Sequence, residues 1–194
     1  GNGVTTIGGW AFEGCSSLKS IVVPKNVENF GEDIFSNCPY LLTIIYLSDY
    51  YSKEGSNATV YNLTDFLPIN EYVYSGKAPT FILHNNPPFY FRSSFDRSLI
   101  KQDVGTYTVP VPLMFNDGRS VSSFDIEYTY TIKPAKIKAR IKNTSRTYGE
   151  TNPKFETTYS GFVNGEDESV ITSHGEYSTT ATYKSDAGEY SIKQ

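Results

Sequence analysis

Apolar, glycine and cysteine positions near the N-terminus recur with one fixed spacing, the one that separates Cys15 from Cys38. This single shift superposes the following pairs: Val4 on Val27, Ile7 on Phe30, Gly8 on Gly31, Ala11 on Ile34, Phe12 on Phe35, Cys15 on Cys38, Leu18 on Leu41 and Ile21 on Ile44. A repeat of this length is typical of solenoids, in which each unit contributes a short strand that stacks on the next. The pattern predicts two repeat units over residues 1–50, with strands over residues 19–23 and 43–47.

The repeat phase also predicts which side chains form the inside of the solenoid. These core positions are Phe12, Cys15, Leu18, Ile21, Phe35, Cys38, Leu41 and Ile44. The cysteines precede each strand, where a small, weakly polar thiol suits a tight interior turn. We expect both as free thiols in the core, with a disulfide between stacked units as the alternative. A nucleophilic cysteine needs an exposed position and a nearby base, so this placement argues against catalysis.

After a polar linker predicted at residues 51–58, the apolar positions change to a period of two. This alternation predicts half-buried strands and a β-sandwich domain over residues 59–133. The clearest strand has the apolar members Phe124, Ile126, Tyr128, Tyr130 and Ile132. A second strand at residues 108–115 precedes it, and the turn sequence Asn116-Asp117-Gly118 between them predicts a hairpin.

Two short sequence motifs each occur twice, once in residues 59–133 and once in residues 134–194, and in the same order. They predict that residues 134–194 are a second copy of this domain. One of them, Asp-x-Gly-x-Tyr, is similar to the tyrosine corner of immunoglobulin-like sandwiches, where the tyrosine hydroxyl bonds to upstream backbone. Its members are Asp103, Gly105 and Tyr107 in the first copy and Asp186, Gly188 and Tyr190 in the second. Because only Ser191 to Gln194 follow the second corner, we expect the second module to lack its last strand and to have an open edge.

Two stretches resemble known families. The run from Ala11 to Val23, with Phe12, Cys15, Leu18 and Ile21 in phase, resembles the BspA-type leucine-rich repeat of bacterial surface proteins. Residues 135–194 contain Tyr148-Gly149, Tyr159-Ser160-Gly161-Phe162 and Asn164-Gly165, and they resemble the MBG domain of the YGX type. The expected fold is therefore mainly β: a short leucine-rich-repeat solenoid fragment followed by two immunoglobulin-like β-sandwich modules, the second truncated.

Composition narrows the classes of partner. The 194 residues include 16 Tyr and 12 Phe, and the formal net charge is −4. A nucleic-acid-binding domain is usually basic, so we expect no nucleic-acid partner. No apolar run is long enough for a transmembrane helix, so we expect no membrane insertion of these residues.

No group of residues in the sequence has the pattern of a catalytic, cofactor or metal site. His84 and His174 lack a neighbouring cysteine or second histidine, and we expect them in loops or at strand ends. Glu166-Asp167-Glu168 lacks the spacing of a calcium loop and is read as solvated, with a Ca²⁺ site as the alternative. The basic row Lys136, Lys138, Arg140 and Lys142 either protects a strand edge or meets an anionic polymer.

Phe89, Tyr90, Phe91 and Arg92 are predicted on a loop after two prolines. Aromatic side chains on a rigid loop suit recognition, although they would equally cover the end of the sandwich or pack on the repeats.

Three functional hypotheses remain open at this point. The first, implied by the family resemblance, is a non-catalytic extracellular or cell-surface bacterial protein that mediates adhesion through its repeats. Its partner would be a host or bacterial surface protein or a glycan, and the sandwich modules would be the stalk. The alternatives are a purely structural spacer and an accessory part of a larger surface enzyme.

Overall fold

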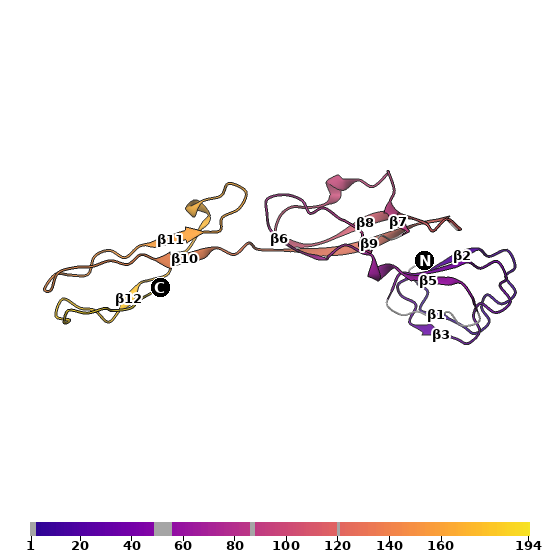
Figure 1. The fold of residues 1–194 in the computed structure, drawn as a ribbon, viewed down its shortest axis with the longest axis horizontal. Coiled ribbons are helices and arrows are strands. Elements are labelled where there is room, and N and C mark those ends of the chain that lie inside the picture. Colours follow the sequence, from indigo (N-terminus) through magenta and orange to yellow (C-terminus); the bar gives the residue numbers. More distant parts are fainter. Residues whose placement is uncertain (1–2, 49–55, 86–87, 120) are drawn as a thin grey trace. The chain divides into compact units, whose positions relative to one another are not determined.

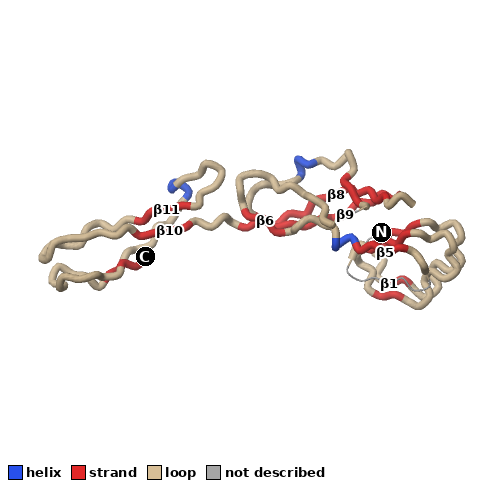
Figure 2. The backbone as a smooth tube through the Cα atoms, in the orientation of Figure 1, coloured by secondary structure: helices blue, strands red, loops and turns tan. Residues whose placement is uncertain are grey.

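The computed structural model describes residues 3–48, 56–85, 88–119 and 121–194. These parts of the chain are mainly β, and their helical residues form three short 3-10 turns, η1 (Leu63–Asp65), η2 (Arg97–Leu99) and η3 (Glu168–Val170) (Figures 1 and 2). The chain divides into two units. The first contains Gly1–Tyr72, Pro79–Lys101 and Thr106–Thr131, and the second contains Val73–Ala78, Gln102–Gly105 and Ile132–Gln194.

The repeats of the first unit form two parallel sheets. β1 (Thr6–Ile7) pairs with β3 (Asn29–Phe30), and β2 (Ser20–Val23), β4 (Thr43–Tyr46) and β5 (Thr59–Asn62) form a three-stranded sheet in that order. Thr6 is opposite Asn29, and Ser20 is opposite Thr43. Both pairs are separated by the same shift that superposes the repeats in the sequence, so the sequence period is the register of the stacked coils.

The third strand of this sheet lies where the sequence predicted the start of the sandwich. β5 pairs with β4, and Thr59 is opposite Thr43, so the step from β4 to β5 is shorter than the step from β2 to β4. The assignment of residues 59–62 to the sandwich was therefore wrong. Of the predicted linker, residues 51–55 lie outside the described residues, and Ala58 is 8% exposed in the repeat core.

Apolar side chains from successive coils fill the inside of the repeats. The buried members are Ile7, Val23, Val27, Ile34, Phe35, Leu41, Ile44, Tyr46 and Ala58, and Phe12, Leu18, Ile21, Phe30, Cys38 and Val60 pack against them. Adjacent coils approach closely at Gly31, where an added Cβ would lie 2.0 Å from the nitrogen of Gly9. Cys15 and Cys38 are free, but both are only half-buried, and Cys15 is not part of this cluster.

Four strands form the next sheet, in the order β6 (Glu71–Val73), β9 (Val121–Lys133), β8 (Gly105–Asn116) and β7 (Phe89–Phe91), and β7 pairs antiparallel with β8. The long hairpin β8–β9 is the one that the alternating pattern predicted. Its buried face consists of Val109, Val111, Leu113, Phe115, Tyr128, Tyr130 and Ile132.

Loop side chains cover part of the buried face of this four-stranded sheet. Phe81 is 3% exposed, and its ring lies 5.1 Å from that of Tyr128 and 5.2 Å from that of Tyr130. Phe95 stacks on Phe81 at 6.4 Å. Among the described residues of 59–133, β5 belongs to the repeat sheet and the other strands form this one sheet, so this stretch does not form the expected two-sheet sandwich by itself.

The second unit contains two short antiparallel pairs, β10 (Lys138–Ile141) with β11 (Thr157–Ser160) and β12 (Ser178–Thr179) with β13 (Ile192–Lys193). This topology differs from that of the four-stranded sheet, so the two predicted copies do not share one strand order. Every residue from 135 to 194 is at least partly exposed to solvent. The apolar side chains of this segment therefore do not enclose a core of their own.

Candidate functional site

The most distinctive site is the outer face of the repeat sheet. Strand residues alternate between faces. One face of β2, β4 and β5 supplies Ile21, Val23, Ile44, Tyr46 and Val60 to the repeat core. The residues between them point the other way: Ser20, Val22, Thr43, Ile45, Thr59 and Tyr61. Thr43 and Ile45 are nevertheless 0% exposed, so this outer face is also covered.

The tip of the β8–β9 hairpin provides that cover within the first unit. The hydroxyl oxygens of Ser20 and Ser122 are 3.0 Å apart. Thr43 Oγ1 donates to Asp117 Oδ2 at 3.2 Å. Each of the three repeat strands contributes to the docking, because β5 also accepts a hydrogen bond at Thr59 from the hairpin.

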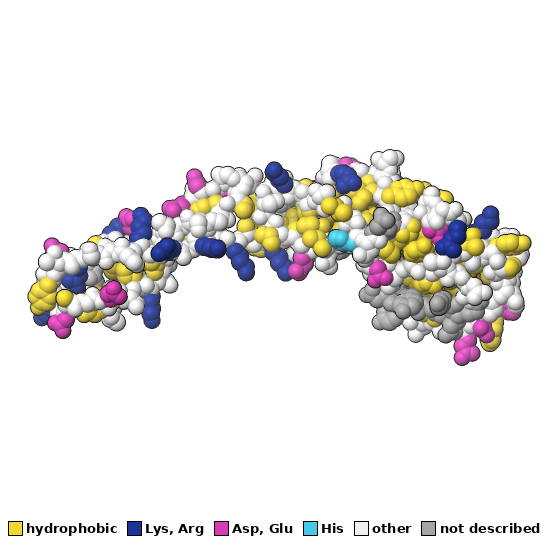
Figure 3. All heavy atoms as spheres, viewed as in Figure 1, with side chains coloured by type: hydrophobic (Ala, Val, Ile, Leu, Met, Phe, Trp, Pro, Cys, Tyr) yellow, Lys and Arg dark blue, Asp and Glu magenta, His cyan; other side chains and the backbone are white. Residues whose placement is uncertain are grey.

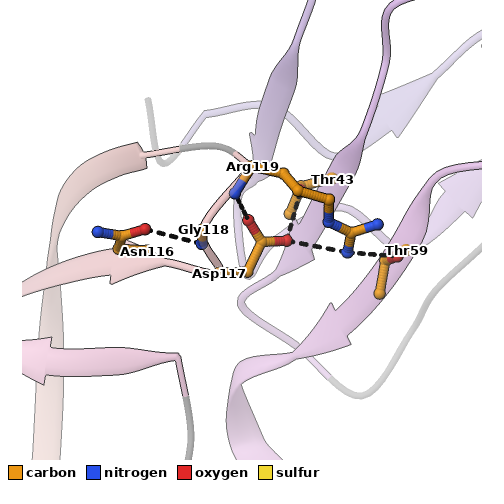
Figure 4. A network of polar contacts seen from close by, with 6 residues as sticks. All are labelled: Thr43, Thr59, Asn116, Asp117, Gly118 and Arg119. Atoms are coloured by element: carbon orange, nitrogen blue, oxygen red, sulfur yellow. Dashed lines mark hydrogen bonds and ion pairs between the residues drawn. The ribbon is translucent and has the colours of Figure 1, made fainter.

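A short polar network fixes the tip of the hairpin on the sheet (Figure 4). Asp117 Oδ1 accepts from the backbone N–H of Arg119 at 2.9 Å, and Asp117 Oδ2 lies 3.1 Å from Arg119 Nη2. That same nitrogen donates to Thr59 Oγ1 at 2.9 Å. Gly118 adopts a φ of +83°, which a residue with a side chain rarely adopts, and its N–H donates to Asn116 Oδ1 at 2.9 Å.

The burial of the network is asymmetric. The Asp117 side chain is 4% exposed, whereas that of Arg119 is 50% exposed. A buried carboxylate is stable only when it is paired and hydrogen-bonded. Thr43, the backbone N–H of Arg119 and the Arg119 guanidinium supply those partners. The carboxylate therefore favours the docked position of the turn, in which all three partners are present.

Aromatic packing continues the interface beside the polar network. The Tyr61 ring of β5 lies 5.0 Å from Phe115 of β8, edge to face, and 6.2 Å from Phe89 of β7. Phe66 lies 6.4 Å from Tyr61 and 5.3 Å from Phe89. Edge-to-face pairs at these distances add stabilisation beyond the burial of their area. The interface therefore combines an apolar part with a polar rim and couples the repeats mechanically to the hairpin.

The predicted binding loop is a strand. Phe89, Tyr90 and Phe91 form β7, opposite Phe115, Met114 and Leu113 of β8. Phe89 is 3% exposed and packs into the interface, and Phe91 stacks on Phe95. Arg92 forms an ion pair with Asp125. Only Tyr90, 47% exposed, retains a surface ring, because Phe89 packs against Tyr61 of the repeat sheet and Phe91 against Phe95.

The tyrosine-corner residues have different surroundings in the two units. Tyr190 Oη donates to the carbonyl of Asp186 at 3.0 Å, which is the upstream backbone contact expected of a corner. Tyr107 lies on β8, and its ring is 5.6 Å from that of Tyr130. Gly188 is exposed, and Gly105 begins β8 with a φ of 156°.

The isolated polar residues make local contacts. His174 Nδ1 lies 3.0 Å from Tyr159 Oη, and the backbone N–H of His84 donates to the carbonyl of Phe66. Glu166 accepts from Tyr74 Oη at 3.1 Å. The pKa of Asp167 is lowered, chiefly because its carboxylate accepts hydrogen bonds from Ser169. In the described parts of the chain no three His, Cys, Asp or Glu residues lie close enough together to hold a metal ion.

Buried tyrosines stabilise the sheet beside the site. Tyr128 Oη donates to the carbonyls of Pro68 and Ile69 at 3.0 and 2.7 Å. Burial raises the pKa of Tyr128 strongly, and the neighbouring Tyr72 contributes further. Tyr130 Oη accepts from the backbone N–H of Lys101 at 2.6 Å, and burial raises its pKa as well. Both hydroxyls therefore connect strands to loops through hydrogen bonds.

Sequence reasoning missed the covered outer face, although a signal for it was present. Val22, Ile45 and Tyr61 are apolar at positions that point away from the repeat core. Strands that are apolar on both faces are typical of sheets that are buried on both faces.

Comparison with known proteins agrees with the resemblance of both stretches. Residues 1–76 match the family model described as BspA type leucine rich repeat region (6 copies), and residues 135–194 match the model described as MBG domain (YGX type). No curated protein and no solved structure matches the chain. Within the described residues, no helix has the length and hydropathy needed to cross a membrane. Each of these two segments is therefore similar to a known family, and BspA-type repeats and MBG domains are both typical of bacterial surface proteins.

Proposed function

We propose that this chain is a non-catalytic part of an extracellular or cell-surface bacterial protein that mediates adhesion through its repeats. In this proposal residues 1–62 form coils of a leucine-rich-repeat solenoid, and residues 135–194 form an immunoglobulin-like module of a stalk. The repeats contact a protein or glycan on a host or bacterial surface. Both family matches support this proposal, because repeats of this kind present extended binding surfaces.

The exposed aromatic rings of the coils carry the proposal, and the docked hairpin determines which surface of the repeats a partner can use. Thr43 and Ile45 lie on the face of the sheet that would otherwise be free for a ligand, and both are fully buried. The repeats in this chain are therefore held in one position by an interface of hydrogen bonds and aromatic contacts. A partner must then use another surface of the coils.

The coils themselves offer exposed aromatic rings. Trp10 is 57% exposed and Tyr40 is 62% exposed. Trp10 is held in a left-handed turn with a φ of 55°, and its backbone N–H donates to the carbonyl of Glu32 at 3.1 Å. A large ring on an ordered turn suits recognition, since tryptophan and tyrosine are enriched among residues that dominate binding energy. We propose these two rings as contact residues.

The non-catalytic role is supported by how the buried polar groups are used. Asp117 connects the hairpin to the repeats, and Tyr128 and Tyr130 connect strands to loops. The hydrogen-bond partners of all three side chains lie on strands or loops of the first unit. Their chemistry is that of structural support.

The experiment compares binding of the full chain and its variants to a glycan array and to immobilised extracellular-matrix proteins and mucin. We expect Trp10→Ala with Tyr40→Ala to weaken binding by about tenfold or more, the loss expected for a dominant aromatic contact. Tyr148→Ala, which removes a ring that is 69% exposed in the second unit, is the matched control. Unchanged binding by the double variant contradicts the proposal.

A purely structural spacer is the second candidate, and the docked hairpin favours it. A spacer must transmit position without binding a ligand, and a fixed junction within the first unit does this. The same experiment separates the two roles. Absence of binding to every immobilised protein and glycan would favour the spacer.

A further inference from the structure

We propose that the free edge of β10 binds an extended polypeptide strand in which acidic side chains alternate with apolar ones. This inference concerns the MBG-type segment and goes beyond the role proposed for the repeats. It is based on the backbone of one edge strand, on the charges along it, and on an open cavity beside it.

The hydrogen bonds of β10 show which backbone groups face outward. β10 pairs with β11, the backbone N–H of Lys142 donates to the carbonyl of Glu156 at 2.8 Å, and Thr158 Oγ1 donates to the carbonyl of Arg140. Antiparallel residues alternate between bonding toward the partner and pointing away. The N–H and carbonyl groups of Ile137, Ala139 and Ile141 therefore point to the other edge, where no described strand pairs with them.

The charges along this edge favour an acidic partner. Lys138 and Arg140 are exposed and lie on one face of β10, and Lys142 on the same face is paired with Glu156 at 2.8 Å. Figure 3 shows Lys and Arg side chains gathered along the stretch around β10. Opposite charges on adjacent strands stabilise pairing, and like charges oppose it. Acidic residues on an added strand would lie beside Lys138 and Arg140.

The other face of β10 borders an open cavity of about 700 Å³. Ile141, the last residue of β10, and Phe155, which precedes β11, line it, and Ile192 lines it from β13. The Phe155 ring lies 5.9 Å from that of Tyr177, so the segments that precede β11 and β12 pack on each other here. Side chains of alternate residues on an added strand would enter this space, which otherwise leaves the apolar lining partly exposed.

A second copy of the chain is a poorer occupant of the edge. Antiparallel pairing of β10 with another β10 would place Lys138 opposite Arg140 of the copy, or similar like charges in other registers. Such pairs are destabilising. The edge thus selects against its own copy while its backbone stays free for a strand of opposite charge.

The test uses the full chain and a short fluorescent peptide in which Asp and Glu alternate with Val and Ile. One control peptide has Lys at the acidic positions, and another has the original residues in scrambled order. Fluorescence anisotropy should show binding of the alternating acidic peptide in preference to both. Lys138→Glu with Arg140→Glu should weaken that binding by about tenfold and favour the Lys peptide instead.

Two further variants separate strand addition from general charge attraction. Lys25→Glu with Lys101→Glu changes the net charge equally at exposed positions of the first unit and should leave the affinity unchanged. Ala139→Pro removes one outward N–H, and proline is tolerated on the free side of an edge strand. This variant should keep its circular dichroism spectrum and lose the peptide.

Several outcomes would overturn the proposal. They are no binding at millimolar peptide, equal binding of the scrambled peptide, or equal loss in the Lys25→Glu, Lys101→Glu control. A concentration-dependent dimer that Ala139→Pro abolishes would assign the edge to a second copy instead.

Discussion

A single carboxylate, that of Asp117, has the greatest influence on how the hairpin meets the repeats. It is almost fully buried, and its partners belong to the same turn and to β4. Such a group favours one docked geometry, because undocking would separate it from Thr43. The half-exposed Arg119 adds a bridge to β5 at Thr59.

Replacing this carboxylate should destabilise the first unit. Asp117→Ala removes an acceptor from Thr43 and Arg119, and we expect a loss of about 1–3 kcal/mol in the free energy of unfolding. Asp125→Ala is the matched control, because its carboxylate pairs with Arg92 but its side chain is 68% exposed. We expect the control to lose less than about 1 kcal/mol. Urea unfolding measures both, and equal losses would show that the Asp117 network has no special role.

The buried hydroxyl of Tyr128 should make stability depend on alkaline pH. Burial raises its pKa in the folded chain above that of the unfolded chain, which is about 10. Its contribution is fully present below pH 10 and is lost as the pH rises toward the folded value, by up to about 1.4 kcal/mol per pH unit. Tyr128→Phe should flatten this decline between pH 10 and 11. Parallel stability curves for the two proteins would contradict this assignment.

At the scale of elements, the repeat period was the most informative feature of the sequence. The shift that superposes Cys15 on Cys38 is also the register of β1 with β3 and of β2 with β4. The alternation of Phe124 to Ile132 likewise predicted β9, and the Asn116-Asp117-Gly118 turn predicted the hairpin. Local patterns of this kind report on elements whose contacts repeat along the chain.

The remaining elements depend on contacts that no local pattern encodes. β5 follows β4 by less than one full repeat, so a fixed-period reading could not assign it to the repeat sheet. β7 has the composition of an aromatic loop, and only its pairing with β8 makes it a strand. Docking of the hairpin depends on outward residues of three strands that match a turn far downstream in the chain. Thr59 of β5, for example, contacts Arg119 of that turn.

Two glycines at equivalent repeat positions test the stacking of the coils. An added Cβ at Gly31 would lie 2.0 Å from the nitrogen of Gly9, whereas one at Gly8 would meet nothing within 4 Å. Gly31→Ala should therefore lower the free energy of unfolding by about 1–3 kcal/mol through overpacking. Gly8→Ala should be close to neutral or slightly stabilising. Thermal unfolding distinguishes the two, and equal effects would argue against stacked coils at this register.

At the scale of the whole molecule, the repeats and the four-stranded sheet lie largely in one unit instead of forming independent beads. The shared interface is the reason, since β2, β4 and β5 are covered on one side by the repeat core and on the other by the hairpin. We therefore expect these parts to unfold together. The MBG-type segment has no buried residue and should open at lower denaturant concentration than the first unit.

The most direct test of the docked hairpin is a disulfide between β2 and β9. The hydroxyl oxygens of Ser20 and Ser122 are 3.0 Å apart, so cysteines at both positions should be close enough to bond. We predict that Ser20→Cys with Ser122→Cys forms an intrachain disulfide under mild oxidation, identified by mass spectrometry of the linked peptides. Ser20→Cys with Ser123→Cys, on the opposite face of β9, should not. Failure of the first pair to link, or equal linking by the second, would contradict docking of the hairpin on the repeat sheet.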